Sequence, residues 1–178
     1  MISKEKNFHF VISPKYQFWK KEINNLILND SCINNHFNNY TRFNWDNDLS
    51  ELNDRINKKI YQLEDNYEII LTNFFNNYHK TNYDTKYWKL IFLPWLRLFL
   101  IHFVTLSIKL EFILNSGQVS SVSLLSGNFF KLIEPNNDYI DFQNILSDID
   151  WNEVVILEIT RDFIINNNLN IIIENISI

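Results

Sequence analysis

Residues 83–114 have the sequence YDTKYWKLIFLPWLRLFLIHFVTLSIKLEFIL, which is a long apolar run with two tryptophans and a proline. Such an apolar run forms either the central helix of a hydrophobic core or a membrane element. A membrane span needs about 20 largely uncharged residues, whereas Arg97 and His102 lie inside this window. A charge at mid-bilayer costs about 2.5–3.5 kcal/mol. We therefore predict a core helix that begins near residues 84–85 and is buried on most sides or kinked at Pro94. Contact with a membrane surface is the alternative.

A second long helix is expected before this one. Asp48, Leu49, Ser50 and Glu51 have the order of a capping box, in which an acid accepts from first-turn amides. The apolar residues that follow recur in steps of three and four, so they form one stripe along an amphipathic helix that ends near residue 78. The stripe consists of Leu49, Leu52, Ile56, Ile60, Leu63, Tyr67, Ile70, Phe74 and Tyr78.

The rest of the chain alternates short β-prone runs with short helical patterns, which is typical of an α/β layer arrangement. We predict a small sheet with two long packed helices and shorter C-terminal helices. Residues 29–44 are polar and turn-rich. An unprotected apolar strand at the end of the chain invites pairing with another segment. Either this strand joins the sheet of its own domain, or the chain stops where a larger protein would continue. The predicted strands are residues 8–13, 26–28, 119–125 and 169–178, and the predicted short helices are residues 16–24, 138–146 and 150–166.

Length and composition exclude several classes of protein. A chain of 178 residues is long enough for one compact domain, so we expect a single domain over residues 1–178. A net charge of −5 argues against a nucleic-acid partner, because phosphate neutralisation needs a clustered basic surface. The single cysteine, Cys32, allows no internal disulfide, and the N-terminal residues lack the apolar core of a signal peptide. These features favour the cytoplasm.

Residue spacing gives no sign of a cofactor or a metal. The glycines Gly117 and Gly127 are isolated, whereas a loop that cradles phosphate needs several glycines. We therefore expect no nucleotide loop of the Walker or dinucleotide type in these residues. The four histidines share no spacing typical of metal ligands, so we expect no metal site.

One acidic cluster is a candidate site. Trp45, Asp46 and Asp48 place carboxylates beside an aromatic ring where a helix begins. Asp46 has the chemistry to act as a base or to bind sugar hydroxyls, with Trp45 as an apolar platform for a sugar ring. Alternatively both aspartates compete for the N-cap and Trp45 anchors the helix, and residue type alone favours this second interpretation.

A second candidate site lies in the apolar helix. Tyr87, Trp88, Trp95 and Arg97 together have the composition of a ligand-binding cleft. An aromatic stripe at helical spacing is, however, more often part of a hydrophobic core.

Several of these residues come in an order that resembles a known family. The N-terminal strand is followed by the elements that carry the resemblance, namely Phe18-Trp19, Trp45-Asp46, Tyr87-Trp88-Lys89-Leu90-Ile91, Pro94-Trp95-Leu96, Pro135-Asn136-Asn137-Asp138, Phe142 and Asp150-Trp151-Asn152. The chain resembles the N-terminal part of a transferase family encoded in O-antigen and other surface-polysaccharide gene clusters. There the corresponding stretches have the form T-A-L-E-E-x-W, H-W-D-D-R, R-Y-W-R-I-L-x-G-P-W-L and D-x-W-N. The resemblance covers residues 8–161.

The resemblance implies a role in O-antigen or lipopolysaccharide biosynthesis. Members of that family are about three times longer, so the nucleotide-sugar site of a glycosyltransferase-like build would lie in a C-terminal domain. This chain is then an acceptor-side portion: a split subunit, a shortened gene product or a truncated relic. Its implied partners are a C-terminal transferase domain or partner chain, a glycan acceptor and, on the cytoplasmic side, the inner face of the membrane.

The chain departs from the family pattern at several positions. Asn44 replaces the family's histidine before Trp-Asp, and Asp48 stands where arginine is usual. Leu93 replaces a glycine, and residues 30–32 replace a Glu-Trp-Cys element. The loss of a histidine and an arginine removes a proton-transfer group and an anion clamp. We therefore expect the chain not to catalyse transfer alone, with Asp46 contacting the acceptor in a complete enzyme. The alternative is a non-catalytic interaction module or a membrane-surface protein.

Overall fold

The structure is a computed structural model that describes residues 8–45, 49–126 and 149–176. The chain divides into two compact units, one formed by residues 1–45 with 109–178 and the other by residues 46–108. The prediction of a single domain over residues 1–178 stays a prediction.

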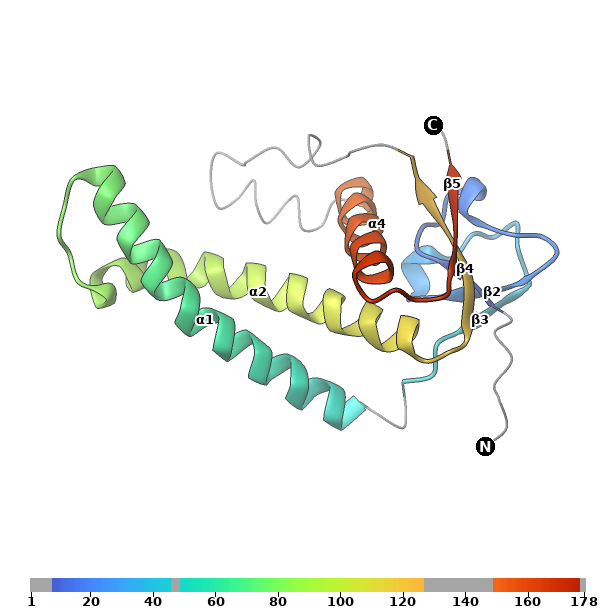
Figure 1. Ribbon diagram of the computed structural model, residues 1–178, viewed down its shortest axis with the longest axis horizontal. Coiled ribbons are helices and arrows are strands. Elements are labelled where there is room, and N and C mark those ends of the chain that lie inside the picture. The colour runs from blue at the N-terminus through green and yellow to red at the C-terminus, as the bar shows by residue number, and fades with distance from the viewer. Residues whose placement is uncertain (1–7, 46–48, 127–148, 177–178) are drawn as a thin grey trace. The chain divides into compact units, whose positions relative to one another are not determined.

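The first unit contains a sheet of five parallel strands in the order β3-β2-β1-β4-β5 (Figure 1). The order reverses between β1 and β4, which makes their boundary the topological switch point of the sheet. With the helices, this sheet confirms the predicted α/β class. The strands are β1 (Phe8–Val11), β2 (Asn24–Ile27), β3 (Tyr40–Arg42), β4 (Val119–Leu125) and β5 (Ile172–Ile176).

The apolar core of the sheet lies where three strands align. Leu26, Phe10 and Val122 stand side by side on β2, β1 and β4, and all three are buried. Helix α4 (Ile149–Asn166) packs against β4. Burial of three such side chains stabilises the sheet by about 1.5–3 kcal/mol each. The predicted strand at residues 119–125 and the predicted helix at residues 150–166 are confirmed.

The apolar tail joins the sheet of its own unit, because β5 pairs with β4 from Ile172 to Ile176. This is the first of the two alternatives considered for the tail. The helix predicted over residues 138–146 lies outside the described residues.

The connections between the first strands differ from expectation. Only a 3-10 turn, η1 (Tyr16–Phe18), forms where a helical turn was predicted over residues 16–24. A second 3-10 turn, η2 (Asp30–Cys32), follows β2, and β3 was not predicted at all. Its three residues are polar or exposed at the edge of the sheet, so they give no alternating apolar signal.

The two long helices are α1 (Leu49–His79) and α2 (Thr85–Asn115), which confirms both predicted helices and their approximate ends. Up to residue 108 they form an antiparallel hairpin within the second unit (Figure 1). Lys80 closes α1 with a left-handed backbone at φ 56°. The Asp84 carboxylate accepts from the Tyr87 amide at 2.8 Å and caps α2.

The expectation that α2 is buried on most sides is wrong. Trp88, Phe92 and Leu96 are buried at four-residue steps, but Leu90 and Ile91 are 82% and 57% exposed. The physical reason is that a two-helix hairpin covers one side of each helix. By length and composition α2 could cross a bilayer, and only 28% of its most apolar window is buried. A core helix can pass the same test of length and composition.

Candidate functional site

The carboxyl edge of the sheet is the place where a parallel α/β layer binds its ligands, outside the strands at the switch point. Here the segment after β1 carries Ser13 and Lys15, and the segment after β2 carries Cys32. Trp45 follows β3, two strands away from β1, which corresponds to about 10 Å across the sheet. Short connections therefore place residues distant in sequence at one edge.

An ion pair joins this edge to α4. Lys15 Nζ lies 3.2 Å from Glu153 Oε2, and the Glu153 side chain is only 3% exposed. Burial raises the pKa of the Cys32 thiol, and the negative charge of Glu153 adds to this effect. Cys32 is therefore a protonated, buried side chain and lacks the thiolate that a nucleophile requires. The edge offers a buried carboxylate with a lysine beside it.

A second charged pair holds the end of β4. The Arg161 guanidinium donates to the Leu125 carbonyl and, at 2.7 Å, to Glu158 Oε1. Because this arginine contacts both the helix and the last residue of the strand, it fixes α4 to the carboxyl edge. Neither the pair of Arg161 and Glu158 nor the pair of Lys15 and Glu153 was predicted from the sequence. The only signal for them was the presence of Glu153 and Glu158 among the apolar residues of the helix, where an acid needs a partner.

The loop after β1 is held by its own hydrogen bonds. The Lys15 amide donates to Ser13 Oγ at 3.1 Å, and the Trp19 indole donates to the Ser13 carbonyl at 3.0 Å. The Phe18 and Trp19 amides close the η1 turn onto Lys15 and Tyr16. These three amides are thus occupied inside the loop, which also contains no glycine. A diphosphate needs free, convergent amides at this position.

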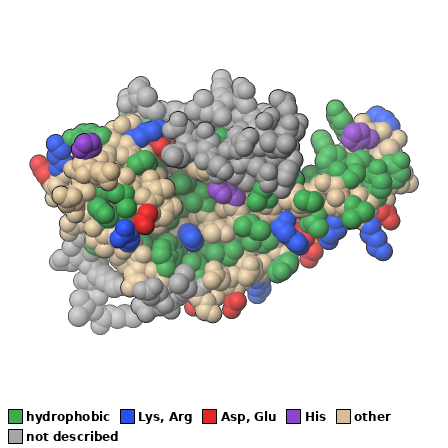
Figure 2. Space-filling view, turned by 180° about the vertical axis from the view of Figure 1, so that it is seen from behind, with side chains coloured by type: hydrophobic (Ala, Val, Ile, Leu, Met, Phe, Trp, Pro, Cys, Tyr) green, Lys and Arg blue, Asp and Glu red, His purple; other side chains and the backbone are tan. Residues whose placement is uncertain are grey.

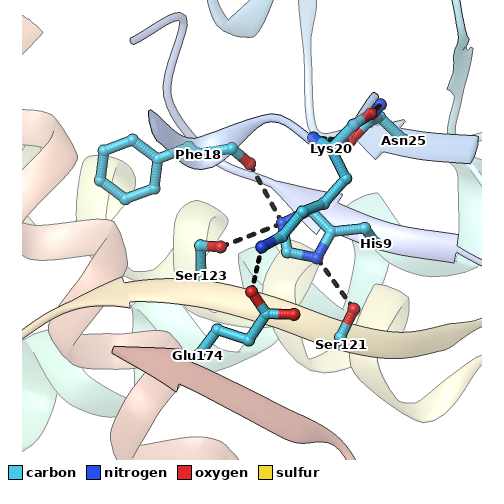
Figure 3. Close-up of polar contacts among 7 residues, drawn as sticks. All are labelled: His9, Phe18, Lys20, Asn25, Ser121, Ser123 and Glu174. Carbon is cyan, nitrogen blue, oxygen red and sulfur yellow. Dashed lines mark hydrogen bonds and ion pairs between the residues drawn. The ribbon is translucent and has the colours of Figure 1, made fainter. Parts of the chain in front are cut away.

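A buried polar row crosses one face of the sheet beside this loop (Figure 3). His9 pairs with Asn25 on β2 and with Ser121 on β4. His9 Nε2 lies 3.0 Å from the Phe18 carbonyl, and Nδ1 lies 2.8 Å from Ser121 Oγ. A carbonyl only accepts, so Nε2 carries the proton and donates, while Nδ1 accepts from the Ser121 hydroxyl. Ser123 Oγ, 3.2 Å from Nε2, shares the same N–H.

Burial lowers the pKa of His9, which keeps the imidazole neutral in this network. The ion pair of Lys20 and Glu174 lies nearby. The negative charge of Glu174 raises the pKa of His9 and so partly opposes the effect of burial. Asn25 continues the row, since its amide donates to the Lys20 carbonyl at 2.8 Å. The row fastens residues 18–20 to the sheet and thereby fixes the loop that follows β1.

The family model for the LIC12162 family transferase matches residues 8–175, almost the whole chain. The chain belongs to the LIC12162 transferase family. No curated protein and no solved structure shows a significant match. The transferase part of the predicted resemblance is therefore confirmed. The O-antigen gene-cluster context and the N-terminal position within a longer protein stay predictions.

The predicted acidic cluster lies only partly within the described residues. Asp46 and Asp48 fall outside them, so their competition for the helix cap stays untested. Trp45 is half-buried, with its ring centroid 4.7 Å from that of Phe43 and Lys109 Nζ 5.7 Å from the centre of the indole. Trp45 thus lies at the carboxyl edge of the sheet, three residues after β3.

The other predicted site residues lie on α2, in the second unit. Trp88 is buried, donates from its indole to Asn76 Oδ1 at 2.8 Å and stacks against Phe75. Tyr87 is exposed beside it. The ring of Trp95 stacks against that of Phe99.

Arg97 lies about 15 Å along the axis from Tyr87, at 1.5 Å per residue. Its guanidinium makes a bidentate contact with Glu64, at 2.8 and 3.1 Å from Nη2. Tyr87 and Trp88 are thus neighbours, while Arg97 is separate from them. The substrate-binding role of all four residues stays a prediction.

Within the described ranges, no three His, Cys, Asp or Glu side chains are placed to hold a metal ion together. The described residues at the carboxyl edge offer a buried carboxylate, a lysine and an aromatic face. Such groups orient hydroxyl-rich ligands, because carboxylates accept hydrogen bonds and an indole face packs against an apolar ring surface.

Proposed function

We propose that this chain serves in the assembly of O-antigen or another bacterial surface polysaccharide, as the N-terminal, acceptor-side part of a LIC12162 family transferase. It does not catalyse glycosyl transfer alone. Membership of a transferase family supports the activity class. The O-antigen context and the N-terminal position come from the resemblance to transferases of surface-polysaccharide gene clusters.

The observation that carries the acceptor-side assignment is the loop after β1. In dinucleotide-binding sheets this loop is glycine-rich, so that its amides close on the diphosphate. Here Ser13, Pro14 and Lys15 occupy the same place, and the amides of Lys15, Phe18 and Trp19 donate within the loop. The carboxyl edge thus favours a ligand without a diphosphate, such as a glycan acceptor.

In the proposed acceptor site, Trp45 supplies a stacking surface and Asp46 contacts a sugar hydroxyl. Trp45 is half-buried, so part of the indole is open to a ligand while Phe43 and Phe112 support the ring. A buried cysteine in a chain with one cysteine fits a reducing compartment. We therefore propose that the chain works in the cytoplasm, where a C-terminal transferase domain or partner chain supplies the donor site.

Calorimetric titration of the purified chain with a panel of surface-glycan oligosaccharides tests the proposal. We expect binding that Trp45→Ala weakens by at least about tenfold, because an aromatic contact and its buried area contribute more than about 1.4 kcal/mol. Ile172→Ala removes an apolar side chain that is 66% exposed at the start of β5, on the opposite edge of the sheet, and it should leave the affinity unchanged. Equal losses in both variants, or no glycan binding at all, would contradict the acceptor role.

Asp46→Ala separates the two interpretations of the acidic cluster. In the complete enzyme we expect transfer to be abolished while the melting temperature is retained. A lower melting temperature with normal residual transfer would assign Asp46 to the helix cap instead, since loss of an aspartate cap costs about 1 kcal/mol.

A further inference from the structure

One apolar stripe on α1 is buried in its first half and exposed in its second. Leu52, Ile56 and Ile60 are 3%, 7% and 6% exposed. At 3.6 residues per turn the same face continues through Tyr67, Ile70, Phe74 and Tyr78. These four residues are 39%, 56%, 56% and 72% exposed. The apolar face of α1 therefore continues past the part of the helix that other residues of the chain bury.

The neighbouring end of α2 extends the exposed surface. Tyr87, Leu90 and Ile91 are 44%, 82% and 57% exposed, and Tyr83 in the connection is 47% exposed. Together with the exposed half of the α1 stripe they form the hairpin tip, defined here as residues 67–91. Figure 2 shows hydrophobic side chains gathered at this end of the hairpin. Exposed apolar side chains gathered at one end of a hairpin indicate an interaction site.

The tip is held by side-chain hydrogen bonds, so its exposure does not result from loose packing. Asn76 Oδ1 accepts from the Tyr83 amide at 2.9 Å and from the Trp88 indole at 2.8 Å. Its Nδ2 donates to the Tyr83 carbonyl at 2.8 Å. Aromatic rings stack beneath the surface, with the Phe75 and Trp88 centroids 5.1 Å apart. The exposed side chains are therefore presented on an ordered scaffold.

The charge of the tip is opposite to that of the whole chain. Between residues 67 and 91, Lys80, Lys86 and Lys89 outnumber Glu68 and Asp84, which gives a net charge of +1 against −5 for the chain. Glu68 is paired with Lys89, and Asp84 caps α2. Lys80 and Lys86 are exposed among the apolar side chains.

We propose that the hairpin tip docks onto an anionic lipid bilayer, with its tyrosines and aliphatic residues in the interfacial region and Lys80 and Lys86 near the headgroups. Tyrosine is enriched at membrane interfaces because its ring is apolar and its hydroxyl stays hydrated. Basic residues near the surface are attracted to anionic lipids. A second copy of the tip would bring like-charged lysines together, which disfavours a homodimer through this surface.

The docking is interfacial. Farther along the hairpin, the Glu64–Arg97 ion pair lies beyond the tip, and charges of this kind favour the aqueous side. This inference does not rest on the acceptor role of the sheet, because the residues that carry it all lie in the second unit.

Co-sedimentation of the full chain with phosphatidylcholine vesicles, with and without phosphatidylglycerol, tests the inference. We expect sedimentation with the anionic vesicles, less with the neutral ones, and a decrease as salt screens the lysines. Phe74→Ser with Leu90→Ser should weaken partitioning at least about tenfold, since burial of one such side chain changes an equilibrium by about that factor. Both side chains are exposed, so the helical circular-dichroism signal should not change.

Tyr61→Ser is the matched control. Tyr61 is 63% exposed on α1 but lies off the stripe, about 100° around the helix from Ile60, so this variant should bind vesicles like the wild type. A chain that stays in the supernatant with anionic vesicles would overturn the inference. The inference also fails if Tyr61→Ser loses as much binding as the double variant. Light scattering that shows a dimer, dissolved by Phe74→Ser with Leu90→Ser in the absence of vesicle binding, would assign the tip to a second copy instead.

Discussion

Replacement of Arg97 by methionine should destabilise the α1–α2 hairpin more than loss of its partner Glu64 does. The Arg97 guanidinium holds both carboxylate oxygens of Glu64, at 2.8 and 3.1 Å. The two side chains differ in environment, since Glu64 is 6% exposed and Arg97 is 49% exposed. Arg97→Met keeps the apolar stem and leaves a buried carboxylate without its cation. Glu64→Gln leaves an arginine that water can reach.

The expected magnitudes follow from this asymmetry. Breaking a fully buried ion pair costs about 3–5 kcal/mol, and a half-exposed arginine reduces that range because water partly replaces it. We therefore expect Arg97→Met to lower the free energy of unfolding by about 2 kcal/mol, against about 1 kcal/mol or less for Glu64→Gln. The double variant should be less destabilised than the sum of the two single variants.

Urea unfolding followed by far-ultraviolet circular dichroism measures these differences, because the two long helices dominate the signal. Equal effects of both single variants, or strict additivity in the double variant, would refute the argument. A third outcome bears on function. If Arg97→Met leaves the free energy of unfolding unchanged but weakens glycan binding, Arg97 belongs to a ligand site. The residue types of Tyr87, Trp88 and Arg97 predicted such a site from the sequence.

Two further predictions concern buried polar groups. Burial lowers the pKa of His9 below 6.5. As the pH drops below that value, the unfolded chain takes up a proton that the folded imidazole does not. The free energy of unfolding therefore falls, by at most about 1.4 kcal/mol per pH unit. Urea titrations across this pH range should show that the free energy of unfolding of His9→Gln falls less steeply than that of the wild type. The same pH dependence in both proteins would contradict a neutral imidazole at His9. Asn76→Ala should lower the free energy of unfolding by about 2 kcal/mol through its lost hydrogen bonds. Asn76→Asp retains the acceptor for the Trp88 indole, so its free energy of unfolding should fall by about half as much as that of Asn76→Ala. Thermal unfolding measures both variants, and equal decreases would show that the indole contact is unimportant.

The helices could be predicted from the sequence because their signals are local. Asp84 lies directly before α2 and caps it through its own side chain, and steps of three and four marked the apolar stripe of α1. How much of each stripe is buried was not predictable, because periodicity shows which side is apolar but not how far a partner extends along it. Leu90 and Phe74 are exposed for this reason. The short strand β3 was missed because Tyr40–Arg42 carries no apolar alternation.

The candidate site was only partly predictable. Trp45 was singled out by residue type, and the structure places it at the carboxyl edge of the sheet. The pair of Lys15 and Glu153 was missed, since a contact between residues so far apart in sequence depends on strand order. Membership of a transferase family was predictable through the resemblance, which short elements such as those with Trp88 and Trp95 carry. The surroundings of those residues required coordinates.

In the proposed site the carboxyl edge of the sheet receives a glycan acceptor and no nucleotide diphosphate. Nuclear magnetic resonance titration of the isotope-labelled chain distinguishes these two ligands residue by residue. Surface-glycan oligosaccharides should shift the indole resonance of Trp45 and the amides that follow β3, while UDP- and CMP-sugars leave the amides of residues 13–19 unmoved. Saturable shifts of residues 13–19 with a nucleotide sugar, without any response of Trp45 to glycans, would show that the edge is a nucleotide site instead.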